Sequence, residues 1–194
     1  ENSGATITPA GRGPDLVVDD NGDTLVAYAR TDDGLAHLAG EQGDGSYGDS
    51  VVDNVEASSG SVSMARDPGG DVLVGFGGTT NPQAPGNLHA FIARRHAGTF
   101  STATVDDSAA LSSIPLVKAS AAGVFALYIQ GDNDDIARLA TASAGGSVFT
   151  ALTVATAPSG GAFSGLGIAL DDDGNPVIAL SSTDDDIVIL RVAP

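Results

Sequence analysis

The chain has 194 residues, a hydrophobic content of 42% and a net charge of −17. This hydrophobic content excludes a disordered acidic tail, and the acidic balance excludes nucleic acid and anionic membrane surfaces as expected partners, because phosphate binding needs basic patches. There is no cysteine, hence no disulfide and no thiolate metal site. No apolar run approaches the roughly 20 residues that a membrane-spanning helix needs, so membrane insertion is not expected.

One motif, two apolar runs around a glycine turn, occurs four times. Its first copy spans residues 16–28 around Gly22, and the other copies surround Gly70, Gly123 and Gly174. The turn glycines therefore follow one another at steps of 48, 53 and 51 residues. A period near fifty that consists of short apolar runs predicts a repeated β-unit.

In chain order, each of the first three units contains four predicted strands. Valine, isoleucine, threonine and small residues dominate these strands, turn-forming residues bound them, and none has a helical period. The predicted strands cover residues 15–18, 24–28, 35–39 and 50–55, then 63–65, 72–76, 88–93 and 99–105, then 116–118, 124–129, 136–142 and 148–154.

The fourth unit contains three predicted strands, at residues 166–170, 176–181 and 187–192, and lacks a fourth. Residues 4–9 resemble the last strand of the third unit, so we expect an N-terminal strand to complete the fourth unit. This strand comprises Ala5, Thr6, Ile7 and Thr8. It closes the fold either in its own chain or in a neighbouring copy, where a donated strand gives a ring or a filament.

These features resemble a four-bladed β-propeller. The expected fold is all-β, with four-stranded antiparallel blades and a last blade completed by the N-terminal strand in cis or in trans. The expected blades cover residues 13–60, 61–114, 115–164, and 165–194 together with 1–12.

The first turn also partly resembles the Asp-box of sialidase-like propellers. Asp20, Gly22 and Thr24 fit that pattern, whereas Val18 and Leu25 do not. Asp-boxes are mainly structural turns in those families, so the resemblance implies a turn and no sialidase activity.

Aspartates gather between the second and third strands of three units, where a propeller would bring them to one face. Ca²⁺ takes six to eight oxygen ligands, so these loops are candidate calcium sites, and calcium is the only cofactor expected. The alternative is that aspartate simply favours turns. The candidate ligands are Asp32, Asp33, Asp132, Asp134, Asp135, Asp184, Asp185 and Asp186.

No catalytic motif is recognisable. His37 and His89 fall in the third strands of neighbouring units, and Arg94, Arg95 and His96 form the one basic cluster, which either faces an acidic neighbouring subunit or sits at a solvated strand end. With 25 acidic residues, some carboxylate pair fits any glycosidase spacing by chance.

The favoured function is therefore a non-catalytic extracellular propeller, a structural, self-assembling or adhesive subunit that is not an enzyme. Two alternatives remain open: a calcium-dependent glycan-binding module, and a glycoside hydrolase or lyase of propeller type. The expected partner is accordingly the chain itself or a glycan. Glu1 follows no Met or leader-like segment, so we expect a processed mature chain that is secreted or lies at the cell surface.

Overall fold

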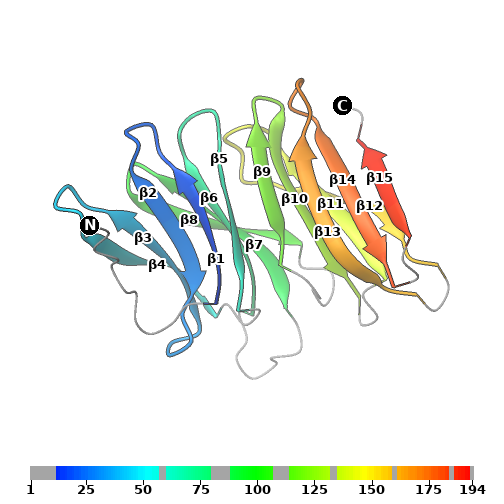
Figure 1. The fold of residues 1–194 in the computed structure, drawn as a ribbon, viewed down its shortest axis with the longest axis horizontal. Coiled ribbons are helices and arrows are strands. Elements are labelled where there is room, and N and C mark those ends of the chain that lie inside the picture. The colour runs from blue at the N-terminus through cyan, green and yellow to red at the C-terminus, as the bar shows by residue number, and fades with distance from the viewer. Residues whose placement is uncertain are drawn as a thin grey trace.

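The computed structural model describes residues 12–56, 60–79, 88–106, 114–131, 135–158, 161–183 and 186–192. All secondary-structure elements in these ranges are β-strands (Figure 1). None of the described segments is a helix long and apolar enough to cross a membrane. The strands form antiparallel sheets in which neighbours in sequence are neighbours in space. The all-β prediction is confirmed.

Four sheets follow one another along the chain, and the described part of the fourth has three strands. The first sheet contains β1 (Arg12–Val18), β2 (Thr24–Ala29), β3 (Leu35–Glu41) and β4 (Tyr47–Glu56). The second contains β5 (Val62–Arg66), β6 (Val72–Gly78), β7 (His89–His96) and β8 (Thr99–Asp106). The third contains β9 (Leu116–Ser120), β10 (Gly123–Gln130), β11 (Ile136–Ala142) and β12 (Thr150–Thr156), and the fourth β13 (Phe163–Leu170), β14 (Pro176–Ser182) and β15 (Ile187–Arg191).

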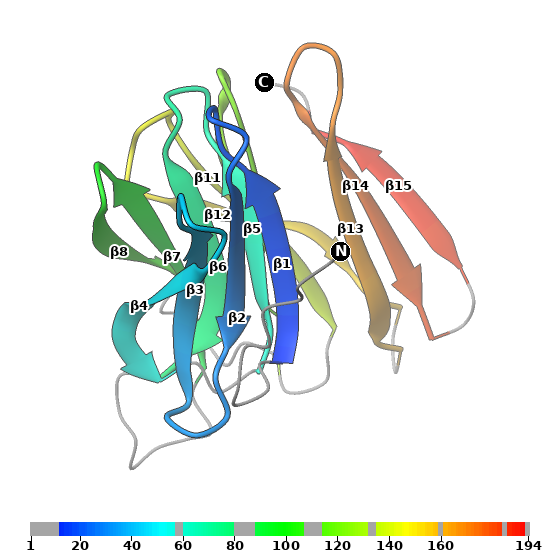
Figure 2. The same ribbon diagram turned by 60° about the vertical axis from the view of Figure 1, so that its left-hand side comes forward.

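The sheets pack face to face as the blades of a propeller-type fold. Their first strands touch in the order β1, β5, β9, β13 (Figure 1). In the described part of the chain, no contact of similar extent joins β13 back to β1, and Figure 2 shows the fourth sheet standing apart from β1. The predicted closing strand, Ala5 to Thr8, lies outside the described residues, so closure of the last blade stays a prediction.

Aspartate side chains build three of the four turns between the first and second strands of each blade. In the first, the Asp19 carboxylate accepts hydrogen bonds from the backbone N–H groups of Asn21 at 2.8 Å and Asp23 at 3.0 Å. The carboxylates of Asp67 and Asp171 likewise accept hydrogen bonds from the backbone N–H groups two and four residues later in the chain. These turns also need a glycine with positive φ, supplied by Gly22, Gly70 and Gly174. The Asp-box-like segments are therefore structural turns.

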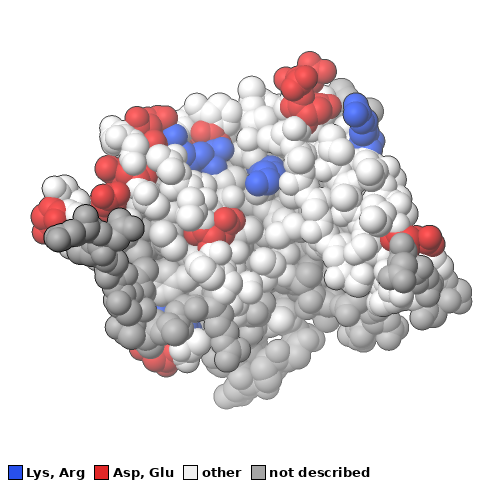
Figure 3. Space-filling view, viewed as in Figure 1, with Lys and Arg blue, Asp and Glu red and all other residues white. Residues whose placement is uncertain are grey.

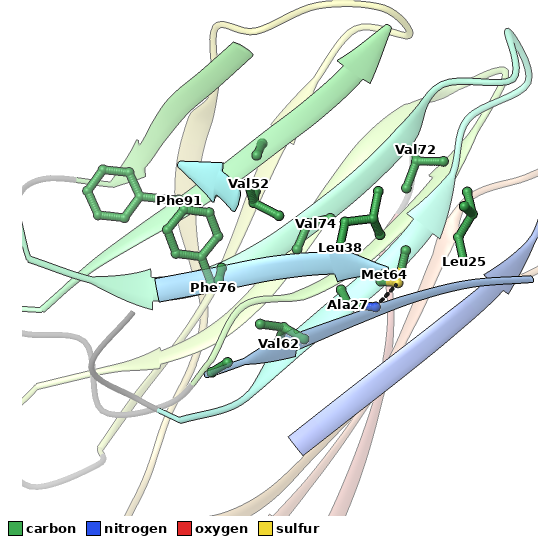
Figure 4. Close-up of a cluster of buried hydrophobic side chains, with 13 residues drawn as sticks. Leu25, Ala27, Leu38, Val52, Val62, Met64, Val72, Val74, Phe76 and Phe91 are labelled. Atoms are coloured by element: carbon green, nitrogen blue, oxygen red, sulfur yellow. Dashed lines mark hydrogen bonds between the residues drawn. The ribbon is translucent and has the colours of Figure 1, made fainter. Parts of the chain in front are cut away.

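The hydrophobic core consists of layers between neighbouring blades. Between the first and second blades, Phe76 stacks on Phe91 with ring centroids 5.6 Å apart, and Leu38 and Val74 are buried in the same layer (Figure 4). The N–H of Ala27 donates to the Met64 sulfur at 3.1 Å across this layer. Fully burying one such side chain is worth about 1.5 to 3 kcal/mol, so each layer holds two blades together strongly.

The registers place four residue pairs at one equivalent position, where the second strand of each blade lies beside the third. These cross-strand pairs are Tyr28–His37, Phe76–Phe91, Tyr128–Arg138 and Leu180–Val188. The same backbone position thus carries ionisable side chains in two blades and apolar ones in the other two.

Candidate functional site: an ionic cluster on the first blade

The largest group of interacting ionisable side chains in the described residues lies on the first blade. We call it the blade-1 cluster; it consists of Tyr28, Arg30, Asp32, Asp33, His37 and Asp49. Strand residues alternate between the two faces of a sheet. Ala27, Ala29 and Leu38 point into the core with the second blade, so Tyr28 and His37 lie on the opposite face of the first sheet.

His37 is the centre of the blade-1 cluster. Its side chain is buried, its Nδ1 lies 3.0 Å from an Asp49 carboxylate oxygen, and its Nε2 lies 2.9 Å from Asp33 Oδ2. Carboxylates only accept hydrogen bonds, so the imidazole satisfies both contacts when both ring nitrogens carry a proton. His37 thus links two carboxylates that come from different parts of the blade.

Arg30 provides the second cation of the cluster. Its Nη2 donates to Asp32 Oδ2 at 2.6 Å and its Nε donates to Asp32 Oδ1 at 2.8 Å, a bidentate pair. Its guanidinium also lies 3.4 Å from Asp33 and 3.5 Å from Asp49. The hydrogen bond from Arg30 lowers the pKa of Asp32 to about 2.

Asp33 and Tyr28 of the cluster differ in their protonation. Burial acts to raise the pKa of Asp33, but hydrogen bonds from the Leu35 backbone and from His37, together with nearby cations, outweigh it and lower that pKa. Burial, followed by the hydrogen bond to Asp49, raises the pKa of Tyr28 to about 12. At neutral pH the cluster therefore holds ionised carboxylates beside a protonated phenol, whose ring stacks on His37 at 5.6 Å.

This chemistry suits a base, a nucleophile or a binding group for hydroxyls, and does not suit a proton donor. The carboxyl groups with resolved shifts all have a lowered pKa, namely Asp20, Asp32, Asp33, Asp44 and Asp71. A carboxylic acid that donates a proton at neutral pH needs a raised pKa. The cluster is partly open, since the side chains of Asp32 and Asp49 are 45% and 38% exposed.

Two smaller ionic groups join or brace the other blades. In the second blade, Arg94 pairs with Asp67 and Asp71, and His96 Nδ1 lies 2.7 Å from Asp71. The predicted basic cluster is thus neutralised largely within its own blade. In the third blade, the Tyr128 hydroxyl donates to Asp106 at 2.6 Å.

Asp106 belongs to the second blade, so its hydrogen bond with Tyr128 crosses a blade junction. Arg138 lies 3.4 Å from the same carboxylate and donates to Gln130 at 2.8 Å. All of these side chains are largely buried, which indicates a structural role for this group.

The predicted calcium ligands that the structure describes fall into two sets. Asp32 and Asp33 belong to the blade-1 cluster, while Asp135 and Asp186 lie at the equivalent ends of the third and fourth blades. Asp132, Asp134, Asp184 and Asp185 lie outside the described residues. Within the described ranges, no three His, Asp or Glu side chains are arranged to hold a metal ion, and this includes His37 and His89. Calcium binding stays a prediction.

A cavity of about 340 Å³ lies between the third and fourth blades. Phe125, Leu152, Pro176 and Val192 give it an apolar lining, and Thr141, Ser143 and Asn175 add polar atoms. None of the lining residues is titratable, so this cavity offers no acid or base.

Acidic residues also gather at the edge that carries the turns between first and second strands. Figure 3 shows acidic side chains along the upper edge, where Figure 1 places the β1–β2 and β13–β14 turns. Those turns contain Asp19, Asp20, Asp171, Asp172 and Asp173. The Asp19 and Asp171 carboxylates accept hydrogen bonds from the turn backbone, and Asp20 pairs with Arg66 of the second blade.

Sequence reasoning did not find the blade-1 cluster, although one signal pointed to it. The turn over residues 31–34 joins β2 to β3, and a hairpin centred there places Tyr28 opposite His37. The third partner, Asp49, lies on β4 opposite Ala39, in the regular part of the β3–β4 pairing, and is a diagonal same-face neighbour of His37. The predicted strand at residues 50–55 begins after Asp49, whereas β4 begins at Tyr47, so the sequence analysis did not place Asp49 beside His37.

Comparisons with solved structures show the fold. No protein-family model and no curated protein matches the sequence. A protein of unknown function from Dyadobacter fermentans is similar over 92% of this chain, with a TM-score of 0.64 and 16% identity. An alpha-L-arabinanase from Penicillium chrysogenum, complexed with arabinobiose, is similar over 91%, with a TM-score of 0.63 and 12% identity. A GH43 glycoside hydrolase with endo-xylanase and exo-arabinofuranosidase activity is similar over 95%, with a TM-score of 0.56 and 12% identity.

The matches cover only part of these larger proteins, namely 59%, 58% and 40% of their respective lengths. They nevertheless correct one prediction. A non-catalytic structural, self-assembling or adhesive subunit with no enzymatic activity is the wrong function to favour, because the structures that share this fold include glycan-cleaving enzymes.

Proposed function

We propose that this chain acts on glycans and belongs to a glycoside hydrolase of propeller fold. The observation that carries the proposal is the likeness of fold to the arabinanase, at a TM-score of 0.63 over 91% of the chain. The GH43 enzyme provides a second example of the same fold in glycan cleavage. A substrate of this class also favours a location outside the cell, as the sequence predicts.

The blade-1 cluster supplies the ionised carboxylate that such a reaction needs. Glycoside hydrolysis uses a pair of carboxyl groups, of which one is ionised and acts as base or nucleophile while the other donates a proton to the leaving group. Asp33 and Asp49 are the two carboxylates held by His37, and Asp33 has a lowered pKa. We assign the ionised role to this pair.

The proton donor must come from outside the cluster. Its phenol, Tyr28, has a pKa of about 12 and is too weak an acid for this role, and the resolved carboxyl shifts are all downward. The catalytic site therefore needs one further carboxyl group that approaches the cluster with the glycan between them.

Hydrolysis assays test this proposal directly. The chain is incubated with arabinan, xylan and arabinose-containing oligosaccharides, and new reducing ends are measured. We expect cleavage of at least one substrate, and a loss of at least tenfold in rate for Asp33→Asn and Asp49→Asn, since one ionised group contributes on the order of 10²-fold or more to such reactions.

Asp44→Asn is the matched control, because Asp44 is an exposed carboxylate in the β3–β4 turn that bonds only its neighbour Ser46. The proposal would be overturned if neither the wild-type chain nor the control cleaved any substrate. It would also be overturned if both cluster variants kept full activity. Binding of the same oligosaccharides without cleavage, abolished by EDTA, would support the calcium-dependent glycan-binding alternative. An increase in melting temperature with calcium would in turn support the predicted aspartate ligands.

A further inference from the structure

The two end blades of the arc each have a face that no described blade covers. On the fourth blade this face contains Ile187, Ile189 and Arg191, which alternate with the residues that pack against the third blade. We call it the outer face of blade 4. On the first blade the corresponding surface contains Leu16, Val18 and Val51, and we call it the outer face of blade 1.

The repeat shows what the outer face of blade 4 is built to do. Ile189 pairs with Ala179 in the same register as Leu38 with Ala27, Ile92 with Gly75 and Leu139 with Leu127. In the first three blades this residue is buried against the following blade, with 2%, 3% and 0% exposed. Ile189 is 69% exposed. The fourth blade therefore presents a blade-packing face that no other blade covers within the described part of the chain.

The outer face of blade 1 has the complementary property. Leu16 lies beside Val26, as Met64 lies beside Val74 and Val117 beside Ala126. Met64 and Val117 are buried against the preceding blade, with 3% and 2% exposed, whereas Leu16 is 59% exposed. Blade 1 therefore presents the surface that a preceding blade would cover.

We propose that the outer face of blade 4 binds the outer face of blade 1 of a second copy of this chain. The outer face of blade 1 also carries Tyr28 and His37 of the blade-1 cluster, so the second copy and a glycan would compete for this face. The chain makes this type of junction three times internally, and blade 1 carries the surface that the outer face of blade 4 fits. Within one copy, the described strands β13 and β1 make no comparable contact. A head-to-tail contact of this kind closes into a two-copy ring or continues as a filament.

Charge complementarity supports the same partner. Arg94 of the second blade and Arg191 of the fourth occupy equivalent positions. Arg94 pairs with Leu73, and Arg191 pairs with Val177. Leu73 and Val177 are each the second residue of the second strand of their blade. Arg94 Nη2 donates to the carbonyl of Gly146 at 3.4 Å, in the turn between the third and fourth strands of the next blade. The equivalent turn of blade 1 spans residues 42–46 and contains the anionic Asp44, whose pKa is lowered by its hydrogen bonds from Ser46.

Light scattering with single-face variants tests the junction. The wild-type chain should have at least twice the mass of one copy, and both Ile189→Asp and Leu16→Asp should return it to the mass of one copy. A mixture of the two variants should restore a two-copy species, because each supplies the face that the other lacks. Val148→Asp is the control, since Val148 is 84% exposed and lies outside both end faces. A wild-type chain with the mass of one copy would overturn the proposal.

Engineered cysteines separate contact between copies from closure within one copy. The chain has no cysteine, so Arg191→Cys and Asp44→Cys introduce the only thiols. When the two single variants are mixed and oxidised, we expect a disulfide-linked pair of chains. A double variant that forms its disulfide only within one chain, together with no cross-link in the mixture, would show that blade 4 closes on its own blade 1 and would refute the proposal. This readout also holds if the aspartate variants fail to fold.

Discussion

The first and second blades place different chemistry at the same position of the sheet. Tyr28 and His37 stack at 5.6 Å with their planes at 26°, and Phe76 and Phe91 stack at 5.6 Å with their planes at 20°. The two arrangements are nearly identical because the repeat fixes the backbone register. The phenylalanine pair nevertheless belongs to an apolar core, whereas the tyrosine–histidine pair is surrounded by carboxylates.

The third blade shows an intermediate case. Tyr128 and Arg138 occupy the same position; the Tyr128 hydroxyl donates to Asp106 from the preceding blade, and Arg138 Nε lies 3.4 Å from the same carboxylate. A propeller blade can thus use this position for packing, for a polar junction or for an ionic site. The difference lies in whether a neighbouring blade covers the pair, and blade 1 has no such neighbour among the described residues.

Truncating the apolar pair should have the largest effect. Phe76 is fully buried between the first two blades, so Phe76→Ala should lower the free energy of unfolding by about 3 to 5 kcal/mol, through lost burial and the cavity left behind. Urea denaturation measures this change. Val148→Ala, at an exposed position, should stay within about 0.5 kcal/mol of wild type. A similar loss in both variants would show that the layer between these blades is not tightly packed.

Removing the polar junction should have the next largest effect. Tyr128→Phe keeps the ring and deletes the hydroxyl that donates to Asp106. The buried carboxylate then loses a hydrogen bond, at a cost of about 1.5 to 3 kcal/mol in the free energy of unfolding. A cycle with Asp106→Asn, also measured by urea denaturation, should show that the two changes are not additive. Additive losses would contradict a direct interaction.

Converting the ionic pair into the apolar one sharpens the contrast between the first two blades. His37→Phe reproduces the Phe76–Phe91 pair in blade 1 but leaves Asp33 and Asp49 without their shared donor. We expect a loss of about 1 to 2 kcal/mol in unfolding free energy, since both carboxylates remain partly hydrated. An increase in stability would mean that the cluster is maintained for function at the expense of stability. Activity measured in parallel shows whether His37 positions the two carboxylates.

The repeat made much of the fold predictable, and its turns illustrate why. Asp19, Asp67 and Asp171 bond backbone groups two and four residues ahead, so the turn is encoded locally. Strands on either side follow from apolar runs of fixed length, which is why the predicted strand at residues 24–28 matches β2 at Thr24–Ala29.

The sites were less predictable because they depend on contacts between distant segments. Asp106 meets Tyr128 only because two blades pack face to face, and Asp49 meets His37 because β4 begins at Tyr47, before the predicted strand at residues 50–55. The sequence did indicate that Asp32 and Asp33 are more than surface charges. It did not indicate that Asp32 contacts Arg30 or that Asp33 contacts His37.

Acid should weaken the blade-1 cluster before it affects the apolar pair of blade 2, and this is the smallest effect expected. Asp32 and Asp33 have lower pKa values in the folded chain than their ordinary value of 3.8. Their contribution is therefore fully present above pH 4 and is lost as the pH falls toward the folded pKa of Asp32, about 2. Melting temperatures recorded between pH 6 and pH 2 should fall less steeply for Asp32→Asn than for wild type, while Phe91→Leu should leave the slope unchanged.

The exposed Arg30–Asp32 pair is also open to screening, so high salt should reduce the difference between Asp32→Asn and wild type. An acid slope that is identical in wild type and Asp32→Asn would show that this ion pair does not stabilise the folded chain.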